Sequence, residues 1–139
     1  KVYDLSNTVV ADMMSFEAFR GVDETPVYLQ IINYIKRGAI AGTIRDGDEL
    51  PSRRVLSALL GINPNTVQKA FHILEEEHLM ESRTGAKSCM TLPPDILDAL
   101  RREVLSDELC TMARTLRQLG ISKEEALRLI EQAWEEEAQ

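Results

Sequence analysis

The chain has 139 residues, of which 44% are hydrophobic and only 5% aromatic, so it can form one domain, or one small domain with an appendage, around an aliphatic core. No apolar run approaches the roughly 18 residues that span a bilayer, and the residues at hand show no signal-peptide pattern, so we expect neither a membrane span nor secretion. Two cysteines, Cys89 and Cys110, make no disulfide framework and favour a reducing cytosol. The net charge of −7 is uneven: residues 23–92 carry 8 basic and 9 acidic side chains, and residues 93–139 carry 6 and 11. The acidity of the whole chain therefore does not exclude a nucleic acid as the partner of its middle part.

Residues 1–22 are the least readable part, and the segment around Ser6–Phe16 predicts at most a short amphipathic helix. The next helix is clearer. We expect Thr25 to cap it, with Pro26 in its first turn and Gly42 as its end. Its buried face should follow the i, i+3, i+4, i+7 spacing of Tyr28, Ile31, Ile32 and Ile35.

Two short helices follow a turn at Asp46-Gly47 and a short extended piece at Glu49-Leu50. The first should run from about Ser52 to Leu60, and Gly61 breaks it. The second should run from about Pro64 to His78, after a three-residue turn, with Asn63 as its N-cap. This spacing predicts a helix-turn-helix.

The remainder predicts a β-hairpin and then a helical pair. Residues 79–92 are predicted to form two strands joined by a turn at Thr84-Gly85. Pro93-Pro94 marks the boundary to the C-terminal piece. One helix there should end at Gly120, and Ser122 with Glu125 forms a capping box for the next. The expected fold is mainly α with a small β-wing, as a winged helix-turn-helix domain (residues 23–92) and a short helical hairpin (residues 93–139).

The helix expected at residues 64–78 divides into two faces at 100° per residue. Five residues should face the core: Val67, Ala70, Phe71, Leu74 and His78. The opposite arc holds Asn65, Gln68, Lys69 and His72, all in the first half of the helix apart from His72 near its middle. Such amide and ammonium groups can read base edges or phosphates in a major groove, although a solvated helix face would look the same.

The charges at the two ends of this motif favour DNA as the partner and indicate which end of the second helix would enter a groove. Arg53 and Arg54 lie in the first turn of the preceding helix, where they oppose the helix dipole by about 0.3–1 kcal/mol each. With Ser52 and the free backbone N–H groups, they suit a phosphate. The acidic run at residues 75–77 lies at the far end of the next helix, so that helix would enter a groove with its N-terminal half.

These residues carry a resemblance. The run "LPSRRVLSALLGINPNTVQKAFHILEEEHLMESRTGAKSCM", with "TPVYLQIINYIKRGAIAGTI" before it, resembles the winged-helix DNA-binding domain of GntR-type bacterial transcription regulators over residues 25 to about 91. The short helical tail is similar to that of the YtrA-like branch. In this family a glycine usually stands where this chain has His78.

The resemblance implies a homodimer that binds an operator in double-stranded DNA and usually represses transcription. It implies that Arg54 contacts a base or phosphate, and that Thr84 and Gly85 form the tip of the wing. The full set of DNA-binding candidates is Ser52, Arg53, Arg54, Asn63, Asn65, Thr66, Gln68, Lys69, Arg83, Thr84, Gly85 and Lys87.

The helical tail is the expected dimerisation segment, because so short a pair buries little surface alone and must pack on the middle domain or a second chain. The candidates are Leu109, Met112, Leu116, Leu127, Ile130 and Trp134, which continue apolar stripes expected to be buried. No catalytic set, metal-ligand cluster or cofactor motif is evident, so we expect no enzyme, no metal and no cofactor; an effector ligand stays open. The alternative function is a winged helix used mainly for protein–protein contact.

Overall fold

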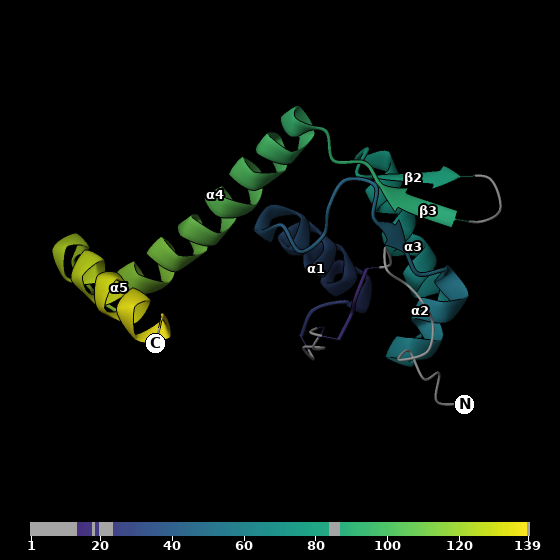
Figure 1. The fold of residues 1–139 in the computed structure, drawn as a ribbon. Coiled ribbons are helices and arrows are strands. Elements are labelled where there is room, and N and C mark those ends of the chain that lie inside the picture. Colours follow the sequence, from purple (N-terminus) through teal and green to yellow (C-terminus); the bar gives the residue numbers. More distant parts are fainter. Residues whose placement is uncertain (1–13, 18, 20–23, 84–86, 139) are drawn as a thin grey trace. The chain divides into compact units, whose positions relative to one another are not determined.

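The computed structural model describes residues 14–17, 19, 24–83 and 87–138 (Figure 1). The chain forms two compact units, residues 1–100 and residues 101–139. In chain order the elements are α1 (Val27–Ala41), β1 (Glu49–Leu50), α2 (Arg53–Leu60), α3 (Pro64–Glu76), β2 (Met80–Arg83), β3 (Lys87–Met90), α4 (Pro94–Gln118) and α5 (Lys123–Glu137). The expected mainly helical fold with a small β-wing is confirmed.

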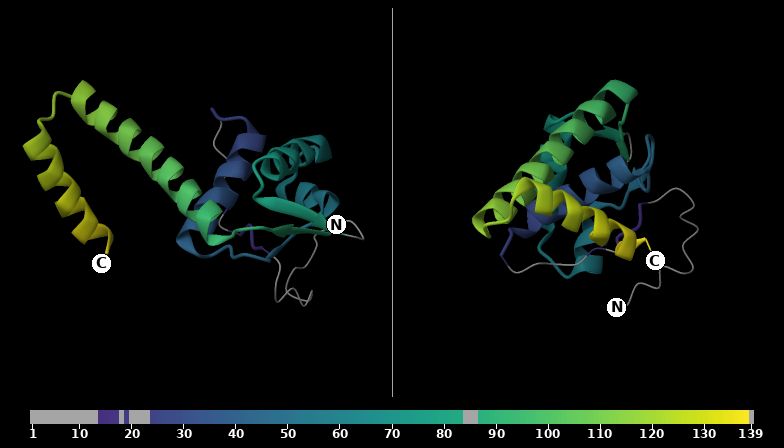
Figure 2. Two further views of the ribbon diagram at one scale, coloured as in Figure 1. Left: turned by 90° about the horizontal axis from the view of Figure 1, so that it is seen from above. Right: turned by 90° about the vertical axis from the view of Figure 1, so that its left-hand side faces the viewer.

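Helix α3 is the centre of the first unit, since α1, α2 and β2 all pack against it (Figures 1 and 2). The most deeply buried aliphatic side chains come from these helices and from the last strand: Ile31, Ile35, Leu56, Val67, Leu74 and Met90. The low aromatic content therefore does give an aliphatic core, whose burial is the main stabilising contribution.

The three strands form one antiparallel sheet in the order β1-β3-β2. Met80 pairs with Met90 and Arg83 with Lys87 along the hairpin, and Leu50 pairs with Ser88 at the other edge of β3. The predicted hairpin and the extended piece at Glu49-Leu50 are thus confirmed. The predicted Thr84-Gly85 turn lies outside the described residues.

Some of the predicted helix ends are confirmed and others are wrong. Gly42, Gly61 and Gly120 all follow helices with positive φ angles, as expected. The prediction that Thr25 caps α1 is wrong: Pro26 occupies the cap position without a side-chain cap, and the Thr25 carbonyl instead accepts a hydrogen bond from Gln30. The prediction that His78 belongs to the core is also wrong, because α3 ends at Glu76 and His78 is exposed with a φ of 62°.

Residues 15, 16 and 19 pack on α1, and residues 14–17 form no helix. Phe16 stacks on Tyr34 at 4.9 Å between ring centroids, and Phe19 meets the same ring edge-on at 5.6 Å. The Tyr34 hydroxyl donates to the Ser15 carbonyl, and the Met14 N–H donates to the Glu49 carbonyl beside β1. The helix predicted for this segment is therefore absent at residues 14–17, and its earlier part lies outside the described residues.

The second unit holds most of α4 and all of α5. Ser122 caps α5 by accepting a hydrogen bond from the Glu125 N–H at 3.2 Å, as the capping pattern predicted. The expectation that Leu127, Ile130 and Trp134 form a buried face is wrong for the single chain, because no described residue of α5 is buried. A pair of helices has one facing side each and too little surface to enclose these side chains. None of the described helices combines the length and apolar character needed to cross a membrane.

Candidate nucleic-acid interface

The start of α2 presents two cations. Ser52 caps the helix, its hydroxyl accepting from the Val55 N–H at 3.1 Å, and Arg53 and Arg54 are exposed in the first turn. No acidic side chain lies in that turn to offset them. Positive charge beside free N–H groups at a helix start suits a phosphate or another anion.

The turn into α3 is built by local hydrogen bonds. Gly61 has a φ of 66°, and the following Ile62 N–H donates to the Ser57 carbonyl, which closes the end of α2. The Asn63 side-chain oxygen then accepts from the Asn65 N–H at 2.8 Å, and Pro64 is the first helical residue. Asn63 is thus the predicted cap; whether it also touches DNA stays a prediction.

The two predicted faces of α3 are present. Val67, Ala70, Phe71 and Leu74 are buried, whereas the opposite arc is exposed: Asn65, Gln68, Lys69 and His72. Thr66 is half-buried between the two faces. The first half of α3 therefore offers amides and an ammonium group to a partner, close to the arginines of α2.

Three of the four exposed side chains are held by neighbours that the sequence did not reveal. Gln68 accepts from Arg53 across the two helices, at 2.8 Å between Arg53 Nη1 and Gln68 Oε1. The Lys69 ammonium lies 4.0 Å from the centroid of the Tyr28 ring on α1. His72 pairs with Glu76 at 3.0 Å.

Tyr28 is the residue that sequence reasoning assigned least well. Its spacing predicted a core position, but it is only half-buried and its ring lies under Lys69. A cation–π contact of this kind contributes about 0.5–1 kcal/mol at an exposed site. The chemistry of tyrosine could have predicted this position. Unlike the isoleucines around it, tyrosine has a polar hydroxyl and a ring face that binds cations, and both suit the edge of a core.

The acidic end of α3 is tied to other parts of the first unit. Glu75 accepts from the Ser82 hydroxyl on β2, and Glu77 pairs with Lys36 of α1 at 2.8 Å. Together with the His72–Glu76 pair, these contacts give every carboxylate of residues 75–77 a partner. Acid and cation thus lie at opposite ends of the helix, as the charge pattern predicted.

The described part of the wing adds two more cations. Arg83 and Lys87 are exposed and directly opposite each other in the hairpin register, and Lys87 lies 3.7 Å from Glu49. Thr84 and Gly85, the expected wing tip, lie outside the described residues. A hollow of about 380 Å³ joins the wing to the helices, lined by Ser52, Arg53, Arg54, Gln68, Phe71, Glu75, Met80, Ser82 and Ser88.

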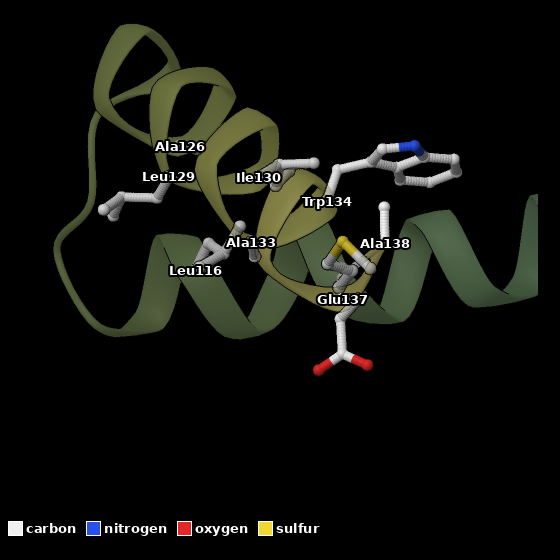
Figure 3. A pocket seen from close by; sticks show the side chains of 9 residues that line it. Leu116, Ala126, Leu129, Ile130, Ala133, Trp134, Glu137 and Ala138 are labelled. Atoms are coloured by element: carbon white, nitrogen blue, oxygen red, sulfur yellow. The ribbon is translucent and has the colours of Figure 1, made fainter.

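The second unit carries an apolar groove between α4 and α5 (Figure 3). Its volume is about 690 Å³, and its lining is Met112, Leu116, Ala126, Leu129, Ile130, Ala133, Trp134, Glu137 and Ala138. Glu137 directs its carboxylate away from the other labelled side chains. Four of the predicted dimerisation residues line this groove, whereas Leu109 and Leu127 are exposed outside it.

Comparison with known proteins places this geometry in a family. Residues 27–87 match the model of the bacterial regulatory proteins of the gntR family. The regulator YhcF of Bacillus subtilis, an HTH-type transcriptional regulator, is 30% identical over 102 residues, which cover 73% of this chain and 84% of YhcF. The chain belongs to the GntR family. It is a DNA-binding winged-helix transcription regulator.

Two further similarities extend this placement. The transcriptional repressor YtrA of Bacillus subtilis is 44% identical over 61 residues, which are 44% of this chain and 47% of YtrA. A GntR-family regulator from Listeria monocytogenes shares 28% identity and superposes with a TM-score of 0.73, over 81% of this chain and 98% of that one. Since the similarity to the Listeria protein runs well beyond the matched domain, it includes part of the C-terminal helices.

Proposed function

We propose that this GntR regulator is a repressor that binds a palindromic operator as a homodimer, with the N-terminal half of α3 in the major groove. The observation that carries the proposal is the exposed set Asn65, Gln68 and Lys69 beside Arg53 and Arg54, with the acidic end of α3 turned to other partners. Amides pair with base edges and cations with phosphates or guanine. The repressor role is supported by the similarity to YtrA.

The apolar side chains of the second unit support the homodimer. Eight large ones are more than one-third exposed: Leu105, Leu109, Met112, Leu119, Leu127, Leu129, Ile130 and Trp134. Fully burying one such side chain contributes about 1.5–3 kcal/mol, so burying the exposed half contributes roughly 1 kcal/mol. If all of these side chains are buried, two copies would gain about 16 kcal/mol, which is at or above the ~4–15 kcal/mol cost of association.

A dimer would also explain how a short operator is read. Two copies of α3 would occupy successive major grooves, with about 10 base pairs between half-site centres. The palindrome follows from the two-fold symmetry of the protein. Each copy contributes several cations to phosphates, so affinity should fall steeply as salt rises.

A gel-shift with the DNA upstream of the protein's own gene tests the proposal, since regulators of this kind commonly control themselves. We expect a retarded band that random DNA of equal length competes away poorly. Replacing Arg54 and Gln68 together by alanine should abolish the specific band. A band that survives this change, or a flat response to salt, would contradict the proposal and favour the protein–protein alternative.

A further inference from the structure

The Arg53–Gln68 hydrogen bond joins two exposed side chains of the helix-turn-helix. Arg53 comes from the first turn of α2 and Gln68 from the first half of α3, and both are exposed. Arg53 Nη1 donates to Gln68 Oε1 at 2.8 Å. The contact crosses the helix-turn-helix, so it does not stabilise either helix by itself.

This contact gives the Gln68 amide a direction. A guanidinium group has donors only, so it can bind the oxygen of an amide and not its NH2 group. Turning the amide over would place two N–H donors against Arg53, which would lose the hydrogen bond. With Oε1 on Arg53, the Nε2 donors point away from the arginine, and the Gln68 side chain that carries them is exposed.

A glutamine held in this way can select between hydrogen-bond acceptors and donors on the edge of a base. A mobile glutamine can present either its oxygen or its NH2 group, and so tolerates base edges of both kinds. The held amide presents donors, which fit the acceptors of the major groove: guanine N7 and O6, adenine N7 and thymine O4. The amino groups of cytosine (N4) and adenine (N6) are donors and do not fit.

We propose that Arg53 is a positioning residue that makes Gln68 a hydrogen-bond donor to an acceptor edge of one base pair in each half-site. The proposal rests on the DNA-binding role argued above and assigns a specificity role within it. Arg53 thus acts through Gln68, in addition to any attraction of its charge to the phosphates. Its neighbour Arg54 has no such bond to Gln68 among the described contacts, and is therefore the matched control.

The experiment is a binding selection followed by a double-mutant cycle on the full chain. Wild-type protein first selects its preferred duplex from a randomised pool. Dissociation constants are then measured for that duplex and for each single base-pair substitution, with wild type, Arg53→Ala, Gln68→Ala, the double variant and Arg54→Ala. Thermal melting of each variant checks that the domain is folded.

We expect Gln68→Ala to abolish discrimination at one base pair per half-site, where wild type discriminates about 5-fold, the lower end of the range for a good bidentate contact, because only the NH2 group of Gln68 is left to read the base. Arg53→Ala should reduce discrimination at that same base pair. The double variant should lose no more of this discrimination than Gln68→Ala alone, because the effects of two coupled residues are not additive. Arg54→Ala should weaken binding and leave discrimination at that base pair intact.

Two outcomes would overturn the inference. If Arg53→Ala weakens binding to every duplex equally and adds to Gln68→Ala, Arg53 is only a phosphate contact. If it changes discrimination at a different base pair, Arg53 reads a base itself. A wild-type protein that selects no duplex from the pool would instead reject the proposed function, and this inference with it.

Discussion

His78 offers the sharpest test of how this fold is held, because the backbone there suits glycine better than histidine. The residue follows the end of α3 with a φ of 62°, in the left-handed region. Its N–H donates to the Glu75 carbonyl at 3.0 Å, and the next N–H, of Leu79, donates to the Leu74 carbonyl at 2.9 Å. These two bonds and the burial of Leu74 and Leu79 form a Schellman motif, which requires the left-handed conformation at His78.

The replacement His78→Gly should therefore stabilise the first unit. A non-glycine residue in this region costs about 1–2 kcal/mol, and histidine lies toward the lower end because it tolerates the region better than most. Glycine gives back about 0.4–1 kcal/mol through the greater freedom of its unfolded chain. From the lower part of the first range and the middle of the second, the net gain is about 0.5 kcal/mol, or a rise in melting temperature of about 2–4 °C for a unit of this size.

Thermal and denaturant unfolding of the full chain measure this change, and the sequence provides a matched control. His72 is exposed within α3, where the same His→Gly replacement should destabilise by about 0.5–1 kcal/mol, partly through the lower helix propensity of glycine and partly through loss of the pair with Glu76. Because His72→Gly also removes the pair with Glu76, His78→Ala completes the control: it removes the imidazole but keeps a Cβ in the left-handed region, and it should not stabilise. A His78→Gly variant that unfolds at the same or a lower temperature would refute the reasoning.

Three other outcomes are expected. Ile130→Asp should dissociate the proposed dimer in light scattering, because it places a charge in the apolar groove, whereas Gln132→Asp should not; equal effects would remove the groove from the interface. The Tyr28 contact draws the Lys69 ammonium toward α1, so we expect Lys69 to contact a phosphate and not a base. Lys69→Ala should therefore weaken binding to all duplexes alike and lower the steepness of log affinity against log salt by about 1 per protomer. A loss of affinity confined to duplexes that differ at one base pair would show that Lys69 reads a base. In the folded protein a thiol reagent should modify exposed Cys110 quickly and buried Cys89 only on unfolding, and two fast thiols would contradict the burial of β3.

The sequence allowed prediction of features that depend on residues close together in the chain. The caps at Asn63 and Ser122 each involve a hydrogen bond over two or three positions, so short patterns reveal them. The buried face of α3 follows from a single period. Most of the fold was predictable for this reason, and the family resemblance supplied the order of its parts.

Contacts between helices were not predictable, because they depend on how α1 and α2 pack against α3. The sequence identified Gln68 and Lys69 as exposed, but not that Arg53 holds one and Tyr28 the other. Thr25 failed as a cap for a related reason. A good capping residue stands there, yet the backbone reaches the helix through Pro26, and the Thr25 carbonyl accepts a side-chain bond from Gln30 instead.

The acidic end of α3 shows how one charge pattern serves both folding and recognition. Read alone, the carboxylates of residues 75–77 only repel DNA and so orient the helix. In the structure Glu75 reaches Ser82 on β2, and Glu77 reaches Lys36 on α1, so the same residues fasten this end of the helix to its neighbours. Because the far end is fastened in this way, the exposed first half of α3 is presented on a fixed support, which a base-reading surface requires.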